Sequence, residues 1–419
     1  MQETRGVAAL LGQAGSGEDA SMDAEASPSQ QQRARRGGPR TEGGDHPKTY
    51  FASQFMQPEW MTDVPSDLGA NWFVMARPEG RRVLLVSSGG RTVSRTRTGA
   101  VLHRMTSSLP EGSAASLSGS DACILDCVYH EADRTYYAQD LLMWRGHSFY
   151  DCTAEFRIAW LQAKLAEEAY GAGGGVCSAT PRGDAMEAKA GTSGCADGDG
   201  GGGGGGGVGR HRLVLSDASP SNAEGQSEPY HLVALTAAVA DATGLAAAHG
   251  VRTPFVKDGL YLLHKEGHYQ AVGPPCPLAL LWKDAACSTY LLDTDPQGVT
   301  LERQLVTLEF RMDGTVATED DPPVVLGQLP QSFVEANAQH LRPGRLLRFT
   351  LGDGGLTFHE GRPAGADLRY EGPGNQRRGR ADTFSKIMFQ YNARRQTITI
   401  EALMQCASHP ALGVEEDMA

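Results

Sequence analysis

The segment RPEGRR, from Arg77 to Arg82, has residue types at the spacing of a site that handles nucleotides. It fills the frame Lys-x-Asp-Gly-x-Arg, in which a deprotonated lysine attacks a nucleoside triphosphate. Arg77 stands at the lysine position, and a guanidinium neither loses its proton in a protein nor acts as a nucleophile. The motif therefore predicts a nucleotide pocket with no catalytic residue. Taken alone, such a pattern is more often a basic turn between two strands.

Strand-like runs flank this motif and must position it. Apolar runs at 72–75 and 82–86 predict two strands, and the apolar density of 136–144 predicts a buried strand that ends in a turn at 145–147. Large side chains then recur at helical spacing, at Phe156, Trp160, Leu161 and Leu165. We expect Phe156 and Trp160 to belong to the hydrophobic core.

The middle of the chain predicts a helix followed by two strands. Residues 231–247 are rich in alanine and favour a helix, whereas the apolar runs at 255–263 and 278–283 predict strands around a pocket. Asp258 and Gly259 interrupt the first run. We expect a structural role for this pair, because a glycine allows close approach of another backbone segment.

The last third of the chain has the pattern of a small β domain. Residues 299–310 alternate, and 312–314 predict a turn. The runs 345–350 and 356–358 predict a hairpin that is closed by the glycine-rich residues 352–355. This spacing predicts a small barrel.

Charge and cysteine usage exclude several functions for this chain of 419 residues. A net charge of -12 argues against a protein that coats nucleic acid non-specifically, since such proteins depend on many phosphate contacts. The eight cysteines form no CxxC pair and no Cys/His grouping with zinc spacing, so we expect reduced thiols, no metal site and no cofactor. No apolar run reaches about 18 residues and no signal-peptide pattern is present, so we expect neither a membrane span nor secretion.

Two segments of low complexity divide the chain. Residues 1–46 contain few large apolar residues and are expected to be a disordered arm, in which the basic cluster 33–40 is more typical of a solvated tail than of a localisation signal. Residues 171–229 include the glycine run 201–207 and are expected to be a flexible, disordered insertion. We expect a further tail at 407–419.

Three segments closely resemble the cap-binding domain of the snurportin family: QFMQPEWMTDVPSD at 54–67, NWFV at 71–74 and ILDCVYHEADRTYYAQDLLMWRGHSFYDC at 124–152. Snurportin carries small nuclear RNPs with a trimethylguanosine cap into the nucleus, and its domain is similar to the guanylyltransferase half of messenger-RNA capping enzymes. The resemblance implies an α+β, nucleotidyltransferase-like fold with antiparallel sheets, as in capping enzymes and DNA ligases, formed by residues 47–170 and 230–289. Residues 290–406 resemble the small OB-like β domain of capping enzymes.

The resemblance assigns residues to the base of the cap. The tryptophan that stacks on the base falls on Trp282, and the tryptophan that packs against the methylated guanine falls on Trp60. A guanine methylated at N7 is cationic, so an indole face above it gains about 1 to 3 kcal/mol. Gln57 and Pro58 lie near the base in this alignment, and Pro58 stands where snurportin has a serine.

The phosphates of the cap are expected to contact basic side chains through charge-assisted hydrogen bonds. The resemblance places the family's phosphate contacts on Arg82 and on Arg97, which replaces a lysine, and the expected set includes Arg77 and Lys283. Two further arginines of the same region are either additional phosphate contacts or solvated loop residues, namely Arg91 and Arg95.

Other landmarks of the capping enzymes are altered in this chain. Residues 126–128, Asp-Cys-Val, stand near the position of an Asp-Gly-Glu, and Leu281 replaces the first lysine of Leu-Lys-Trp-Lys. The Arg-x-Asp-Lys motif of the OB domain remains only as basic residues at 375–380. These losses are hard to reconcile with GMP transfer, so we expect a protein that is not an enzyme.

The leading hypothesis is a non-catalytic adaptor that binds the 2,2,7-trimethylguanosine cap of spliceosomal small nuclear RNA and shuttles as a monomer between cytoplasm and nucleus. The resemblance implies importin-β as a partner, although the basic importin-β-binding segment is not recognisable here. The alternatives are an RNA guanylyltransferase that uses a lysine from elsewhere in the chain, and an inactive interaction scaffold derived from that enzyme. No membrane partner is expected.

Overall fold

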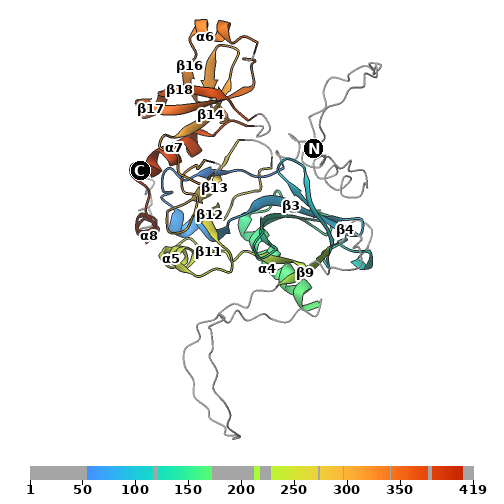
Figure 1. Ribbon diagram of the computed structural model, residues 1–419. Helices are drawn as coiled ribbons and strands as arrows, with labels where there is room; N and C mark the ends of the chain where they lie inside the picture. Colours follow the sequence, from blue (N-terminus) through green and yellow to red (C-terminus); the bar gives the residue numbers. More distant parts are fainter. Residues whose placement is uncertain are drawn as a thin grey trace, which may run out of the picture.

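The computed structural model describes residues 54–116, 121–171, 212–217, 228–271, 274–295, 297–339, 341–375 and 380–408. Within these ranges the chain forms a large unit of two sheets and a smaller β unit, and the smaller unit lies at the upper end in Figure 1. The predicted arm at 1–46 and the basic cluster 33–40 lie outside the described residues. So do most of the insertion and almost all of the predicted tail.

The first sheet carries most of the residues that surround the candidate site. Its five strands follow the order β1-β13-β12-β2-β11, and only the β1–β13 pair is parallel. The bounds are β1 Pro58–Trp60, β2 Trp72–Pro78, β11 Ala238–Val239, β12 Lys257–His264 and β13 Cys276–Trp282. The strands expected at 72–75, 255–263 and 278–283 are therefore present, with shifted ends.

The second sheet closes on itself. Its order is β10-β9-β5-β4-β3-β6-β7-β8, and the first strand, β10, also pairs in parallel with β7, the strand next to the other end. The bounds are β3 Arg81–Ser88, β4 Arg91–Thr96, β5 Val101–Thr106, β6 Cys123–His130, β7 Thr135–Trp144, β8 His147–Ser148, β9 Leu213–Asp217 and β10 Tyr230–Ala234. The predicted strands at 82–86 and 136–144 are confirmed as β3 and β7. Because β9 bridges β5 and β10, part of the predicted disordered insertion is a barrel strand.

Three apolar clusters hold these sheets and their helices together. One lies between the two sheets, and a second fills the closed sheet and contacts α4 (Ala154–Gly171). The third covers the other face of the first sheet with α3 (Leu68–Asn71), α5 (Ala242–Gly250) and α8 (Ile400–Ser408). The short 3-10 helix Ala114–Ser116 completes the large unit. None of the described helices is long and apolar enough to cross a membrane.

The small unit is a five-stranded antiparallel sheet in the order β16-β15-β14-β17-β18. Its elements are β14 Leu305–Phe310, β15 Thr315–Ala317, β16 Val325–Gln328, α6 Gln331–Ala336, β17 Arg345–His359, β18 Arg362–Pro373 and α7 Phe384–Ala393. The outer strands β16 and β18 contact one another, so the sheet curls towards a small barrel. The described chain is β-rich, so the predicted α+β class with antiparallel sheets and the predicted small OB-like β domain are confirmed only in part.

Two local predictions were wrong because tertiary pairing overrides local pattern. The helix expected at 231–247 is instead strand β10, whose backbone pairs with β7 and β9, followed by the shorter helix α5. The glycines at 352–355 do not turn the chain. They form a bulge inside the single long strand β17, which pairs with β18 on both sides of it.

Two side-chain or domain predictions also need correction. Phe156 is 47% exposed, although it stacks against the buried Phe149, so it is not a core residue. Helix α8 lies inside the range predicted for the OB-like domain, but Ile400 and Leu403 are buried in the core of the large unit. The chain therefore leaves the large unit, forms the small unit and returns (Figure 1).

Candidate nucleotide-type binding site

Asp258 is the centre of a mixed-charge cluster at the border between the two units. Its carboxylate accepts hydrogen bonds from Arg77 Nη1 and Lys283 Nζ, and a third from Ser288 Oγ at 2.8 Å. The three charged side chains are 7% to 19% exposed. Arg77, Lys283 and Asp258 come from three distant segments of the sequence, and the fold brings them to one point.

Backbone geometry at Gly259 makes this convergence possible. Gly259 has φ +95°, and a Cβ there would lie 2.4 Å from the Trp282 carbonyl oxygen and 2.7 Å from Lys283 Cγ. Only glycine lets the two strands approach so closely in this conformation. The expected close approach at Gly259 is therefore observed. The same turn holds Arg77 near Asp258, because Glu79 N donates to the Val256 carbonyl at 2.8 Å.

The cluster keeps a net positive charge. Two cations share one carboxylate, so the sum of formal charges over Arg77, Lys283 and Asp258 is about +1. Burial lowers the pKa of Lys283, although Asp258 opposes that shift. A partly buried cationic pair with one counter-ion suits an anionic group such as a phosphate, which accepts several charge-assisted hydrogen bonds.

Trp60 lies beside this cluster at the edge of the first sheet. The Lys283 Nζ is 5.5 Å from the centre of the Trp60 ring, which is partly exposed. Gln57 and Pro58 precede it, and the Gln57 carbonyl accepts a hydrogen bond of 2.6 Å from Cys276 N. The structure thus brings together Trp60, Arg77 and Lys283 from the predicted set. An aromatic surface and cationic side chains lie side by side, as a nucleotide ligand requires.

Trp282 does not belong to this surface. Its indole is 0% exposed, and Nε1 donates to the Ile398 carbonyl at 3.0 Å. Side chains of a strand alternate between faces, and Trp282 pairs with Leu260 on the face that α5 and α8 cover, whereas Trp60 pairs with Leu281. The predicted stacking role of Trp282 is therefore wrong for this conformation, because the ring has no face open to a ligand.

Arg82 is held by a buried partner rather than presented to a phosphate. Its Nε donates to Asp126 Oδ1 at 3.0 Å, and Tyr269 OH donates to Asp126 Oδ2 at 2.7 Å. Desolvation opposes the charge of Arg82, but Asp126 outweighs it and raises the pKa of the guanidinium. Asp126 offsets the charge of Arg82, so the predicted phosphate role requires breaking a buried ion pair, which is costly.

Arg97 is exposed in the turn between β4 and β5 and acts electrostatically on Glu319 of the small unit. Glu319 also forms an ion pair of 2.9 Å with Arg380. Arg95, by contrast, is 6% exposed and donates to the Gly99 carbonyl at 3.1 Å, so it is not a solvated loop residue. Arg97 and Arg82 are thus placed in different surroundings from the Asp258 cluster.

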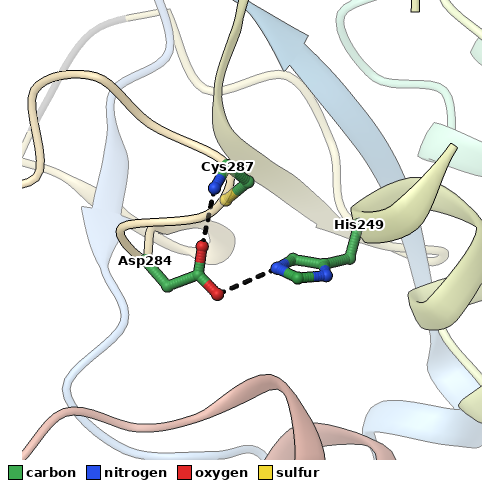
Figure 2. A group of neighbouring side chains, drawn as sticks. All are labelled: His249, Asp284 and Cys287. Atoms are coloured by element: carbon green, nitrogen blue, oxygen red, sulfur yellow. Dashed lines mark hydrogen bonds and ion pairs between the residues drawn. The ribbon is translucent and has the colours of Figure 1, made fainter. Parts of the chain in front are cut away.

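Sequence spacing missed a second polar group, which Figure 2 shows around Asp284. His249 Nε2 lies 2.8 Å from Asp284 Oδ2, and Cys287 N donates to Asp284 Oδ1 at 2.8 Å. The donor atoms of His249, Asp284 and Cys287 lie within 4.8 Å of one another and could hold a metal ion. Burial raises the pKa of the Cys287 thiol to about 12, so it is protonated at neutral pH. In this arrangement the group fastens the turn that carries Ser288 to α5.

Fold and site together define a β-rich protein in which two cationic side chains, Arg77 and Lys283, lie beside the partly exposed ring of Trp60. Residues 54–172 match the family model described as the Snurportin1 m3G cap-binding domain. The resemblance to snurportin drawn from the sequence is therefore confirmed over that segment.

Solved structures of DNA ligases show a distant likeness to the chain. A mycobacterial DNA ligase D complexed with ATP and MES is 12% identical, with a TM-score of 0.30, over 78% of this chain and 98% of that one. The Chlorella virus DNA ligase-adenylate is 8% identical, with a TM-score of 0.26, over 76% of this chain and 100% of that one. Values this low carry no argument about activity.

Proposed function

We propose that this protein binds the methylated guanosine cap of RNA without performing chemistry on it, with the trimethylguanosine cap of small nuclear RNA as its ligand. The observation that carries the proposal is the match of residues 54–172 to the snurportin cap-binding model. The Asp258 cluster supports it, because Arg77 and Lys283 offer positive charge to phosphate oxygens and Trp60 offers an aromatic face to a cationic base.

Arg77 cannot act as the nucleophile of a nucleotidyltransferase. It occupies the lysine position of the nucleotidyl-transfer frame between β2 and β3, and its guanidinium is paired with Asp258. A guanidinium cannot form the phosphoramide that such transfer needs. We infer a nucleotidyltransferase-like scaffold that binds its ligand without reacting with it, with the small β unit in the place of an OB domain.

One observation favours the alternative of a guanylyltransferase. Lys283 lies next to Arg77, and burial lowers its pKa, as an activated lysine nucleophile requires. The same Nζ, however, is held by Asp258 and approaches the Tyr290 carbonyl at 3.4 Å. Incubation with labelled GTP and Mg²⁺, followed by denaturing electrophoresis, separates the two. The proposal predicts no labelled band, and a band lost in Lys283→Ala would establish the enzyme.

We further propose that the bound RNA–protein particle is carried into the nucleus by an import receptor such as importin-β, which makes the protein a monomeric shuttle between cytoplasm and nucleus. This role is inferred from the snurportin resemblance alone. Capture of the full chain by immobilised importin-β, with and without capped RNA, tests it. If importin-β retains the chain neither with nor without capped RNA, the adaptor role is contradicted.

Binding itself is tested by titrating the full chain with a fluorescent trimethylguanosine cap dinucleotide and following anisotropy. The proposal predicts saturable binding that weakens with salt, because part of the affinity comes from phosphate contacts. Unmethylated GpppG serves as the matched competitor, and it should compete poorly because its guanine lacks the positive charge that favours an indole face. Equal competition by GpppG would contradict recognition of the methylated base.

A further inference from the structure

Phe389 of α7 is buried, yet it belongs to none of the hydrophobic cores of the described residues. It is 6% exposed, whereas its neighbour Ile387 packs into the core of the small unit. The Phe389 ring instead faces Trp60 of the large unit, with ring centres 4.9 Å apart and planes inclined by 45°. Trp60 is also outside the three cores of its own unit. Two large aromatic rings therefore pair with each other across the border between units.

This ring pair lies directly beside the cationic cluster. Lys283 Nζ is 5.5 Å from the Trp60 ring centre and is bonded to Asp258. A phosphate at Lys283 would therefore place an attached nucleoside within reach of the two rings. The two aromatic rings lie outside the hydrophobic cores and beside a cationic cluster. A stacked base needs such surroundings.

We propose that Phe389 is the second wall of the base site, so that a methylated guanine is held between Trp60 and Phe389, one ring from each unit. This inference rests on the proposed cap-binding function and adds a contribution of the C-terminal unit to it. A base between two rings makes two stacking contacts of about 3.5 Å each, which requires ring centres about 7 Å apart. The rings must separate by about 2 Å and become more parallel.

The contact between α7 and β1 permits such an opening. The Trp60 backbone N–H donates to Ser385 Oγ on α7 at 3.3 Å, which is long for a hydrogen bond. At the same border burial raises the pKa of Glu59, and the nearby charge of Asp320 adds to the rise. On its other side α7 is tied to the connecting segment, because Gln390 bonds to the backbone of Leu291 and Asp293 at 3.1 Å. Because Ile387 is packed in the core of the small unit, an opening must carry that unit, α7 and the segment between β13 and β14 away from Trp60 together.

The test compares Phe389→Ala, Phe389→Leu and Phe389→Trp with the wild-type full chain in titrations with the trimethylguanosine cap dinucleotide. Loss of one base–aromatic stack predicts affinity reduced by roughly 5- to 150-fold for the Ala and Leu variants, while Trp retains it. Phe389→Leu keeps the apolar volume, so a fold defect of the Ala variant, detected by circular dichroism, does not remove the test. Phe358→Ala, on an exposed residue of the same unit, is the matched control and should bind as wild type.

Each outcome decides the inference. Unchanged or tighter binding by Phe389→Leu would overturn it, and tighter binding would make Phe389 a ring that merely covers Trp60. Weaker binding by both variants with wild-type binding in the control supports it. If the wild-type chain binds no methylated cap at all, the proposed function fails and the inference fails with it. If the wild type binds the cap and the Phe389 substitutions leave the affinity unchanged, only the inference fails.

Discussion

Replacing Trp282 with alanine should lower the free energy of unfolding without removing a contact to the cap. The indole is 0% exposed and packs with Leu260, Leu403 and other residues of the core beneath α5 and α8. Truncation of a buried tryptophan to alanine costs about 3–5 kcal/mol of unfolding free energy. The Ile398 carbonyl also loses its donor, and a group left unsatisfied by such a loss typically costs about 1–3 kcal/mol. We expect a total near the upper end of the first range.

Urea unfolding, monitored by far-ultraviolet circular dichroism, measures this loss. The variant should unfold at a lower urea concentration than the wild type, with a similar dependence of the free energy on urea. Trp60→Ala is the matched control, because Trp60 is partly exposed and lies outside the cores. It should cost less stability and weaken binding of the cap dinucleotide, whereas folded Trp282→Ala should bind normally. If Trp282→Ala keeps wild-type stability and abolishes cap binding, the burial argument is refuted and Trp282 is the stacking platform.

Three further predictions concern charge. Asp258→Asn should release Lys283 and Arg77 and tighten binding of the cap dinucleotide at low salt; weaker binding at every salt concentration would contradict a phosphate role for the cations. Arg97→Ala should leave the preference among methylation states unchanged in competition titrations, because phosphate contacts position a ligand without specifying its base. Burial raises the pKa of Glu319 to about 7, although Arg380 and Arg97 oppose the rise and Asp320 adds to it. The free energy of unfolding should therefore fall as pH rises from about 4.5 to 7. Chemical denaturation across that range should show a shallower fall for Glu319→Gln.

The direction of the Glu319 effect follows from proton uptake. A carboxyl group whose pKa is higher in the folded state binds more protons when folded, so its stabilising contribution is complete below the unfolded pKa and is lost as pH rises through the folded value. The side chain is 24% exposed, which limits the effect to the order of 1–3 kcal/mol. A fall of equal size in wild type and Glu319→Gln would assign the pH dependence to other groups.

Sequence predicted those features that depend on local pattern. The apolar run of β7 specified a buried strand, and RPEGRR lies at the turn between β2 and β3, as its flanking apolar runs indicated. Arg77, Lys283 and Trp60 were proposed from the motif frame and the family resemblance, and their roles in binding stay predictions. The convergence of Arg77 and Lys283 on Asp258 became visible only with the pairing of β12 with β2 and β13.

The errors share a physical cause, which is that sequence does not specify which face or partner a segment finds. Trp282 occupies the position its motif predicts, yet strand alternation turns it towards α8, a helix more than 110 residues away in the sequence. Phe389 carried no recognisable signal, because an apolar residue of a helix usually packs into its own unit. Arg82 was expected to contact phosphate, because its contact with the buried Asp126, which lies diagonally across from it and pairs with Leu84, follows only from the β3–β6 register.

Trp60, Arg77 and Lys283 should together bind a methylated cap without reacting with it. Calorimetric titration of the full chain with the trimethylguanosine cap dinucleotide, beside the double variant Trp60→Ala/Lys283→Ala, tests it most directly. We predict one site per chain in the wild type and loss of that site in a double variant that circular dichroism shows to be folded. Undiminished binding by the folded double variant would contradict the claim.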